Sequence, residues 1–155
     1  MNGLQFSTST SSTLGQMYSQ TQRSYMSPQW SGVVLVSELS QWQIEAIRKL
    51  FQLLALDSDW DSYGSPPPSE VAVTAAGRLI LGIDLDYFVS PRIVPVSGGG
   101  VQLEWSFGSR GVEIEIDDEA SAGYLKSHHG KPIEEGQISL ADFSLIRSLL
   151  IWLIE

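Results

Sequence analysis

The stretch that decides the fold is VQLEWSFGSRGVEIEI, residues 101–116. Apolar and polar side chains alternate through residues 101–107, and they alternate again over residues 112–117, after a turn at Gly108–Gly111. A period of two places successive side chains on opposite faces of a strand. The sequence therefore predicts a β-hairpin with one apolar and one polar face, which is typical of an antiparallel sheet covered on one side.

Shorter strands flank this hairpin and extend it into an antiparallel meander of three to four strands. Arg92–Val96 (RIVPV) precedes it across the glycine turn at residues 98–100, and a further strand is expected around Ala122–Lys126. Proline cannot donate a ladder hydrogen bond, so Pro95 predicts that the first of these strands lies near a sheet edge.

Helical patterns lie before and after the meander. Ser40 and Gln43 have the spacing of a capping box, which predicts a helix over Gln41–Leu56. Its apolar residues fall on one helical stripe, formed by Trp42, Ala46, Ile47, Leu50, Phe51 and Leu54. After the Pro66–Pro68 block, Ser69 is the expected N-cap of a second helix, and Glu70 in its first turn complements the helix dipole.

The second helix is predicted to bury its small and aliphatic residues, which are Ala72, Ala75, Ala76, Leu79, Ile80 and Ile83. A third helix is expected over Leu140–Ile154 with Ser139 as its N-cap. Its apolar positions are Phe143, Ile146, Leu149, Leu150 and Leu153. Helices on both sides of a one-faced meander predict an α+β two-layer sandwich in the order α-α-β-β-β-β-α.

The first 31 residues differ in composition from the rest of the chain. Twelve of them are Ser or Thr, and Arg23 is their only charged side chain. Such a segment offers too little apolar surface to offset its ordering entropy, so we expect residues 1–31 to be a disordered tail and residues 32–155 to be a single domain. Gly32–Val36 (GVVLV) fits either an edge strand or an apolar lead-in to the first helix.

The charge of the chain is concentrated in the expected domain. The sequence has 9 Lys and Arg against 18 Asp and Glu, a net charge of −9, and residues 32–155 hold all but one of these charges. This acidity disfavours direct contact with nucleic acid or an anionic membrane and favours a basic protein partner. The absence of cysteine excludes disulfides, thiolate metal ligands and a cysteine nucleophile.

No apolar run approaches the roughly 20 residues that cross a bilayer, and the N-terminus lacks the basic and apolar regions of a signal peptide. From these patterns we expect a soluble cytoplasmic protein.

The densest acidity follows the hairpin. Five carboxylates fall within residues 113–119, and hairpin pairing is expected to bring Glu104 alongside Glu113 or Glu115, where like charges destabilise unless something compensates them. A solvated strand face is the simpler interpretation. The functional interpretation is a docking surface formed by Glu104, Glu113, Glu115 and Asp117, with Trp60 as an exposed aromatic contact.

Asp57, Asp59 and Asp61 alternate like the opening of an EF-hand calcium loop. The diagnostic Gly and Glu of that loop are replaced here by Ser62 and Pro68, so these residues are weak metal candidates. The alternative is a turn in which the Asp side chains accept backbone hydrogen bonds while Trp60 packs on the prolines.

The only histidines, His128 and His129, are adjacent and have no zinc-site spacing. The sequence also lacks a GxSxG elbow, a GxGxxG fingerprint and a P-loop. We therefore predict no cofactor and no metal site.

Three segments resemble a recurrent pattern in small bacterial proteins without an assigned activity: WDSYGSPPPSEVAVTAA (60–76), PRIVPVSGGGVQLEW (91–105) and VEIEI (112–116). The pattern joins a W-D-x-[YG]-G-x-P-P-P-S segment to a G-G-G-x-x-L-E-W strand. The resemblance covers roughly residues 40–125 and implies one fold unit that begins at the first helix. It transfers no catalytic residue, and the Ser/Thr-rich N-terminal extension departs from it.

These observations lead to three hypotheses. The first is a non-enzymatic interaction module, like an antitoxin, immunity protein or inhibitor subunit, whose acidic sheet face docks a basic partner. The second is a carboxylate- or metal-dependent hydrolase that uses the Asp57–Asp61 loop or the Asp117–Glu119 cluster. The third is a structural subunit of a larger assembly.

Overall fold

Within the residues that the structure describes, two helices, five strands and a further helix follow one another. The computed structural model describes residues 39–84 and 90–155, and Leu39–Glu155 form one compact unit. Its elements are α2 (Gln41–Leu53), α3 (Glu70–Gly82), β1 (Arg92–Val96), β2 (Gly100–Phe107), β3 (Arg110–Ile116), β4 (Ala122–His128), β5 (Lys131–Ile138) and α4 (Phe143–Ile154). The expected tail at residues 1–31 and the apolar Gly32–Val36 segment lie outside the described residues.

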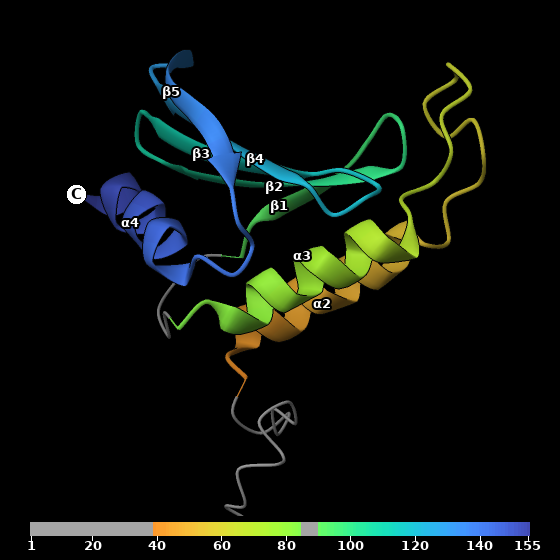
Figure 1. Ribbon diagram of the computed structural model, residues 1–155, viewed down its shortest axis with the longest axis horizontal. Helices are drawn as coiled ribbons and strands as arrows, with labels where there is room; N and C mark the ends of the chain where they lie inside the picture. Colours follow the sequence, from red (N-terminus) through yellow and green to blue (C-terminus); the bar gives the residue numbers. More distant parts are fainter. Residues whose placement is uncertain (1–38, 85–89) are drawn as a thin grey trace, which may run out of the picture. The chain divides into compact units, whose positions relative to one another are not determined.

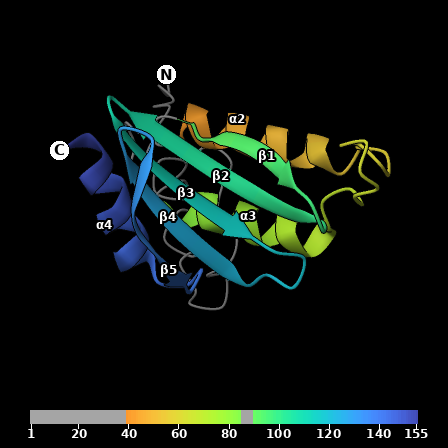
Figure 2. The ribbon, with the colours of Figure 1, turned by 90° about the horizontal axis from the view of Figure 1, so that it is seen from above.

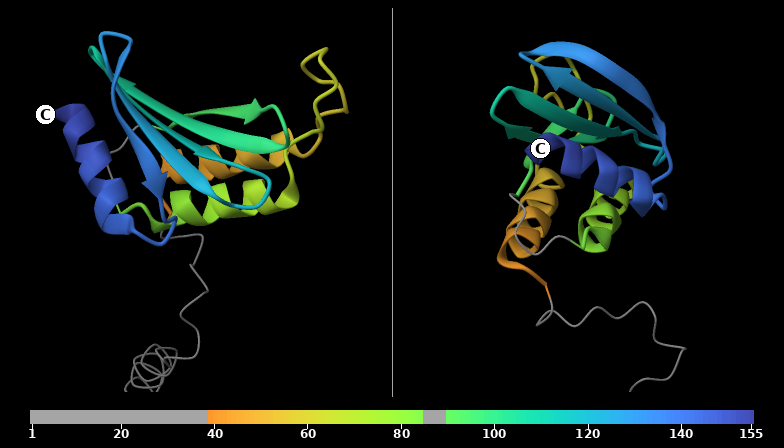
Figure 3. Two further views of the ribbon diagram at one scale, coloured as in Figure 1. Left: turned by 45° about the horizontal axis from the view of Figure 1, so that its top comes forward. Right: turned by 90° about the vertical axis from the view of Figure 1, so that its left-hand side faces the viewer.

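The five strands form one antiparallel sheet in sequence order, β1-β2-β3-β4-β5. All three helices lie on one side of this sheet (Figure 1), and the other side faces the viewer in Figure 2. Figure 3 shows the same separation of helices and strands from two further directions. The predicted α+β two-layer sandwich is confirmed, with five strands in place of three to four.

The strand that sequence analysis missed is β5 (KPIEEGQI). It lies at the edge of the sheet and is exposed over most of its length, so its sequence lacks an alternating apolar pattern. Its pairing with β4 follows from the turn, because both central residues of the turn have positive φ, 52° at His129 and 71° at Gly130. Two positive φ angles are characteristic of the two-residue type I′ hairpin turn.

The opposite edge agrees with the sequence prediction. Among the described residues β1 pairs only with β2, and Pro95 lies opposite Val101 in that pair. The missing N–H of proline therefore interrupts no interior ladder, as expected for an edge strand.

The core lies between the helices and the apolar face of the sheet. The predicted alternation of the central hairpin is confirmed, since its apolar side chains are almost completely buried: Val101, Leu103, Trp105, Val112, Ile114 and Ile116. From the helices the core receives mainly Trp42, Ala46, Leu50, Ala72, Ala76, Leu79, Ile80, Ile146 and Leu150.

α2 is shorter than predicted and buries a narrower stripe. It ends at Leu53, where tight turns replace the helical pattern, with Ala55 N–H donating to Gln52 O and Leu56 N–H donating to Leu53 O. Phe51, predicted on the buried stripe, is 63% exposed. The buried positions Trp42, Ala46 and Leu50 repeat every four residues, and Phe51 lies one residue, about 100°, beyond that row.

Gln43 joins the start of α2 to the end of α3. Its Oε1 accepts the Ser40 N–H at 3.0 Å, which confirms the predicted capping box. Its Nε2 donates to Ile80 O at 3.0 Å and to Ile83 O at 3.3 Å, so it also satisfies carbonyls at the C-terminal end of α3. This buried amide has partners on both helices, and the capping motif by itself indicated only the first.

The third helix begins three residues later than predicted. Its N-cap is Asp142, whose Oδ1 accepts the Leu145 N–H at 3.0 Å, whereas Ser139 accepts from Ala141 and Asp142 in the preceding turn. Phe143, expected on the buried face, is 42% exposed and lies against Gly82. A side chain at position 82 would collide with that ring.

Trp152 fastens α4 to the helix-facing side of the sheet. Lys126 Nζ lies 4.4 Å and Arg110 Cζ lies 5.1 Å from the centroid of the Trp152 ring. Arg110 Nη1 also donates to Trp152 O at 2.6 Å. Lys126 makes a 2.8 Å ion pair with Glu134, which lowers the pKa of that carboxyl. Two cations of the sheet are thereby engaged on its inner side.

Within residues 39–84 and 90–155, none of the helices has the length and apolar character needed to cross a bilayer.

Replacing Gln43 with Ala is expected to lower the free energy of unfolding by about 1–3 kcal/mol, because buried groups at two helix ends lose their hydrogen bonds. Urea denaturation measures this change. Gln41→Ala is the matched control, since Gln41 makes only an exposed contact with Glu45. Equal losses in the two variants would contradict the bridging role of Gln43.

Candidate functional site

The side of the sheet that faces away from the helices, hereafter the outer face, carries the residues of the docking hypothesis. Antiparallel register aligns them in two rows across the strands. One row consists of Arg92, Glu104, Glu113, Leu125 and Glu135, and the next consists of Val94, Gln102, Glu115, Gly123 and Gln137. Strands β2, β3 and β5 thus contribute carboxylates to one surface.

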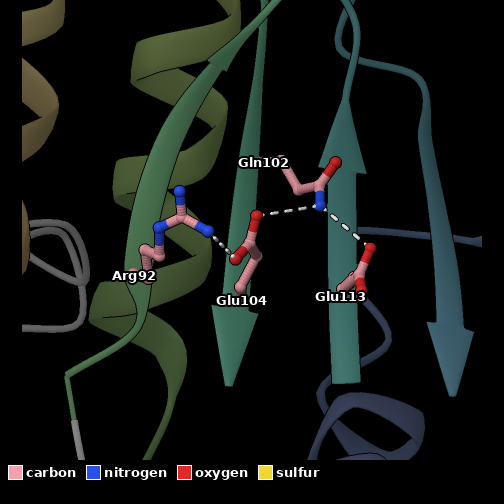
Figure 4. A network of polar contacts seen from close by, with 4 residues as sticks. All are labelled: Arg92, Gln102, Glu104 and Glu113. Carbon is pink, nitrogen blue, oxygen red and sulfur yellow. Dashed lines mark hydrogen bonds and ion pairs between the residues drawn. The ribbon is translucent and has the colours of Figure 1, made fainter. Parts of the chain in front are cut away.

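Glu104 and Glu113 lie directly opposite each other across β2 and β3, as the hairpin pattern suggested. The intervening amide of Gln102 donates to both, at 3.2 Å to Glu104 Oε1 and 2.9 Å to Glu113 Oε2 (Figure 4). Arg92 Nη1 donates to Glu104 Oε2 at 2.9 Å. The like charges, for which we expected a basic partner to compensate, are therefore compensated in part within the sheet.

Glu115 differs from these two carboxylates. It lies opposite Gln102 and Gly123, is exposed, and has no hydrogen bond or ion pair with another described side chain. Its charge is available to a partner without breaking a contact of the fold.

The outer face is hollowed over β3, β4 and β5. This hollow has a volume of about 610 Å³, and its charged lining consists of Glu113, Glu115, Asp117 and Glu135. None of the described residues that line it is Lys or Arg. A second hollow of about 640 Å³ shares Glu113 and contains Arg92, Arg110 and His129, so its charge is mixed.

Asp117 contributes to the hollow and also shapes the turn that follows β3. Its Oδ1 accepts the N–H groups of Glu119 at 3.0 Å and Ser121 at 2.8 Å. Of the predicted docking residues, Asp117 is therefore the one whose carboxylate is occupied by backbone donors.

The loop between α2 and α3 matches the turn interpretation. Asp61 accepts from Tyr63 N–H, Ser65 N–H and the hydroxyls of Ser65 and Ser97. These hydrogen bonds, led by that of the Ser65 hydroxyl at 2.6 Å, lower the pKa of Asp61 from 3.8 to about 2. Asp59 accepts the Gly64 N–H at 2.7 Å. Two of the three weak metal candidates thus serve as acceptors within the loop.

Trp60, proposed as an exposed aromatic contact, is half-buried in the same loop. Its indole N–H donates to Pro66 O at 3.0 Å, consistent with packing on the prolines. The highly exposed aromatic of this loop is Tyr63, at 92%. Trp60 and the hollow come from different parts of the fold, and Trp60 is not among the residues that line it.

In the part of the chain that the structure describes, no three or more His, Asp or Glu side chains are grouped to hold a metal ion. The rings of His128 and His129 lie 4.3 Å apart at the β4–β5 turn, where His129 N–H donates to Ser109 O.

The sequence hypotheses did not include Glu135 and Gln137, which line the hollow from β5. The strand itself was missed, and so were its outward side chains. The signal that indicates them is the His129–Gly130 turn, which pairs β5 with β4 and aligns Glu135 with Leu125.

Comparison of the chain with protein-family models, with curated proteins and with solved structures gave no match.

Asp61→Asn is expected to destabilise the protein in a pH-dependent manner. A carboxyl whose pKa is lower in the folded state stabilises that state above its unfolded pKa of 3.8, and the contribution disappears as the pH falls towards 2. The difference in melting temperature between wild type and variant should therefore shrink over that range. Asp57→Asn is the control, because Asp57 has no hydrogen bond with another described residue. A difference independent of pH would contradict this assignment.

Gln102→Met is expected to cost about 1 kcal/mol of unfolding free energy, because it leaves two carboxylates facing each other without the shared donor. In a Glu113→Gln background the same change should cost less, since the like-charge pair is gone. Urea denaturation of the four proteins measures this coupling. Equal costs in both backgrounds would exclude the bridging role of Gln102.

Proposed function

We propose that this protein is a non-enzymatic interaction module that docks a basic protein partner on the outer face of its sheet, in the manner of an antitoxin, immunity protein or inhibitor subunit. The observation that carries the proposal is the acidic hollow of about 610 Å³. Its position supports this role, because the helices lie on the other side of the sheet (Figure 2) and Glu115 and Glu135 are exposed.

The charge arrangement favours recognition of a cationic surface. Glu115 and Glu135 add negative charge to the hollow without an ion pair among the residues described. Complementary charge raises association rates and selectivity more than it raises affinity. Binding should therefore weaken as added salt screens the exposed charges.

Asp61 and Glu134 are poorly suited to general acid catalysis at neutral pH. A general acid at neutral pH needs a pKa raised towards 7. The pKa of Asp61 is lowered by its hydroxyl and backbone donors, and that of Glu134 is lowered by Lys126 and Tyr124. Glu104 and Glu113 are held by the amide of Gln102. These contacts favour the interaction module over the hydrolase alternative.

Glu115→Lys is expected to abolish recovery of the basic partner in affinity purification from the native host, because it reverses the charge of an otherwise unengaged side chain in the hollow. Glu45→Lys is the matched control, since it makes the same change in net charge on α2, in the helix layer.

The wild type and Glu45→Lys should recover the same partner, and increasing salt should release it. If Glu115→Lys recovers that partner undiminished, the outer face is not the docking surface. If the partner that depends on Glu115 is acidic, the charge argument is wrong.

A further inference from the structure

The floor of the acidic hollow is formed by two residues of β4 that carry no charge. Gly123 lies between Glu115 and Gln137, and Leu125 lies between Glu113 and Glu135. Neighbouring strands are about 4.8 Å apart, so β3 and β5 are separated by about 10 Å across this floor. Carboxylates of β3 and β5 therefore flank the narrow surface of β4, which is apolar at Leu125 and has no side chain at Gly123.

Space above Gly123 is a property of the fold. A Cβ atom at this position would meet Gly136 O at 3.5 Å and Gln137 Nε2 at 3.7 Å, which are ordinary contact distances. The backbone of Gly123 also has no positive φ. Neither steric crowding nor backbone conformation therefore requires glycine at position 123. The effect of having glycine there is that the floor of the hollow stays open.

We propose that this hollow binds the side chain of one arginine of the partner protein. The guanidinium group would lie between the carboxylates of Glu115 on β3 and Glu135 on β5, which lie diagonally across β4 and have no ion pair among the described residues. Its methylene stem would lie on Leu125. Guanidinium presents donors along several edges of a plane and suits two carboxylates on opposite sides, whereas the lysine ammonium is a compact point charge. Long cationic side chains commonly cover apolar surface with their stems.

A bare metal ion fits this arrangement less well. Calcium gathers several oxygen ligands at about 2.3–2.6 Å, and in the part of the chain that the structure describes no three His, Asp or Glu side chains are grouped to hold a metal ion. An organic cation several ångströms wide suits carboxylates on strands about 10 Å apart. This inference rests on the proposed function, because it names the group by which the basic partner would be recognised.

The test uses the full-length chain labelled with nitrogen-15 and three blocked pentapeptides, Gly-Gly-Xaa-Gly-Gly, in which Xaa is arginine, lysine or citrulline. Arginine is expected to shift the amide resonances of Gly123, Leu125 and Gln137 in a saturable manner. Citrulline, which has the shape of arginine but no charge, should not shift them. Lysine should bind more weakly than arginine.

Two variants separate charge from shape. Glu115→Gln removes one wall charge, and Gly123→Val fills the floor while leaving every charge in place. Each is expected to weaken arginine-peptide binding by about tenfold, comparable to the loss of one charge-assisted contact. Glu119→Gln is the charge control, because Glu119 is outside the lining. Gly123→Ala fills the floor by one methyl group only. Its melting temperature checks that the fold tolerates a side chain at this position.

Undiminished binding by Gly123→Val, equal shifts with citrulline, or equal affinity for lysine would each overturn the arginine pocket. The purification experiment separates this result from the proposed function. If Gly123→Val still recovers a partner that Glu115→Lys loses, the acidic face docks the partner and the arginine pocket is wrong. If the arginine peptide binds as expected while Glu115→Lys retains the partner, the proposed function fails and the pocket stands.

Discussion

The register between β2 and β3 is the constraint on which the rest of the structure depends. Leu103 lies opposite Ile114, and both side chains are completely buried against the helices. Because side chains alternate with a period of two, a slip of β3 by one residue against β2 would turn Glu113 and Glu115 into the core and expose Val112, Ile114 and Ile116. Burying those charges without partners would cost far more than a hairpin contributes. The hydrophobic effect therefore determines which residues reach the outer face.

The same alternation separates the charges of the sheet. Arg110 and Lys126 have the inward parity, and they are engaged with Trp152 and the end of α4. Glu113 and Glu115 have the outward parity, and only Glu113 finds a donor in the sheet. The outer rows of the sheet thus carry Glu104, Glu113, Glu115 and Glu135 against Arg92. Arg110 and Lys126 contact the C-terminal helix and do not neutralise that surface.

Prediction from sequence was accurate where the local sequence pattern was strong. Strong alternation gave the central hairpin, and the Ser40–Gln43 spacing gave the capping box of α2. Errors arose where local patterns were weak or degenerate, as at β5 and Phe51. β5 is an exposed edge strand, so its position depends on pairing with β4 more than on its own burial. Phe51 has the same spacing as core residues, but the packing of α2 leaves it outside the contact.

By itself, the sequence determined the α+β class, the apolar and polar faces of the hairpin, and the concentration of carboxylates after residue 112. These are properties of local periodicity and composition, which a linear pattern contains. Tertiary structure alone decided that Gln102 bridges Glu104 and Glu113, that Glu115 has no ion pair among the described residues, and that Glu135 lines the same hollow from the far side of β4. Those relations link residues on different strands, and cross-strand register, which no single segment specifies, brings them together.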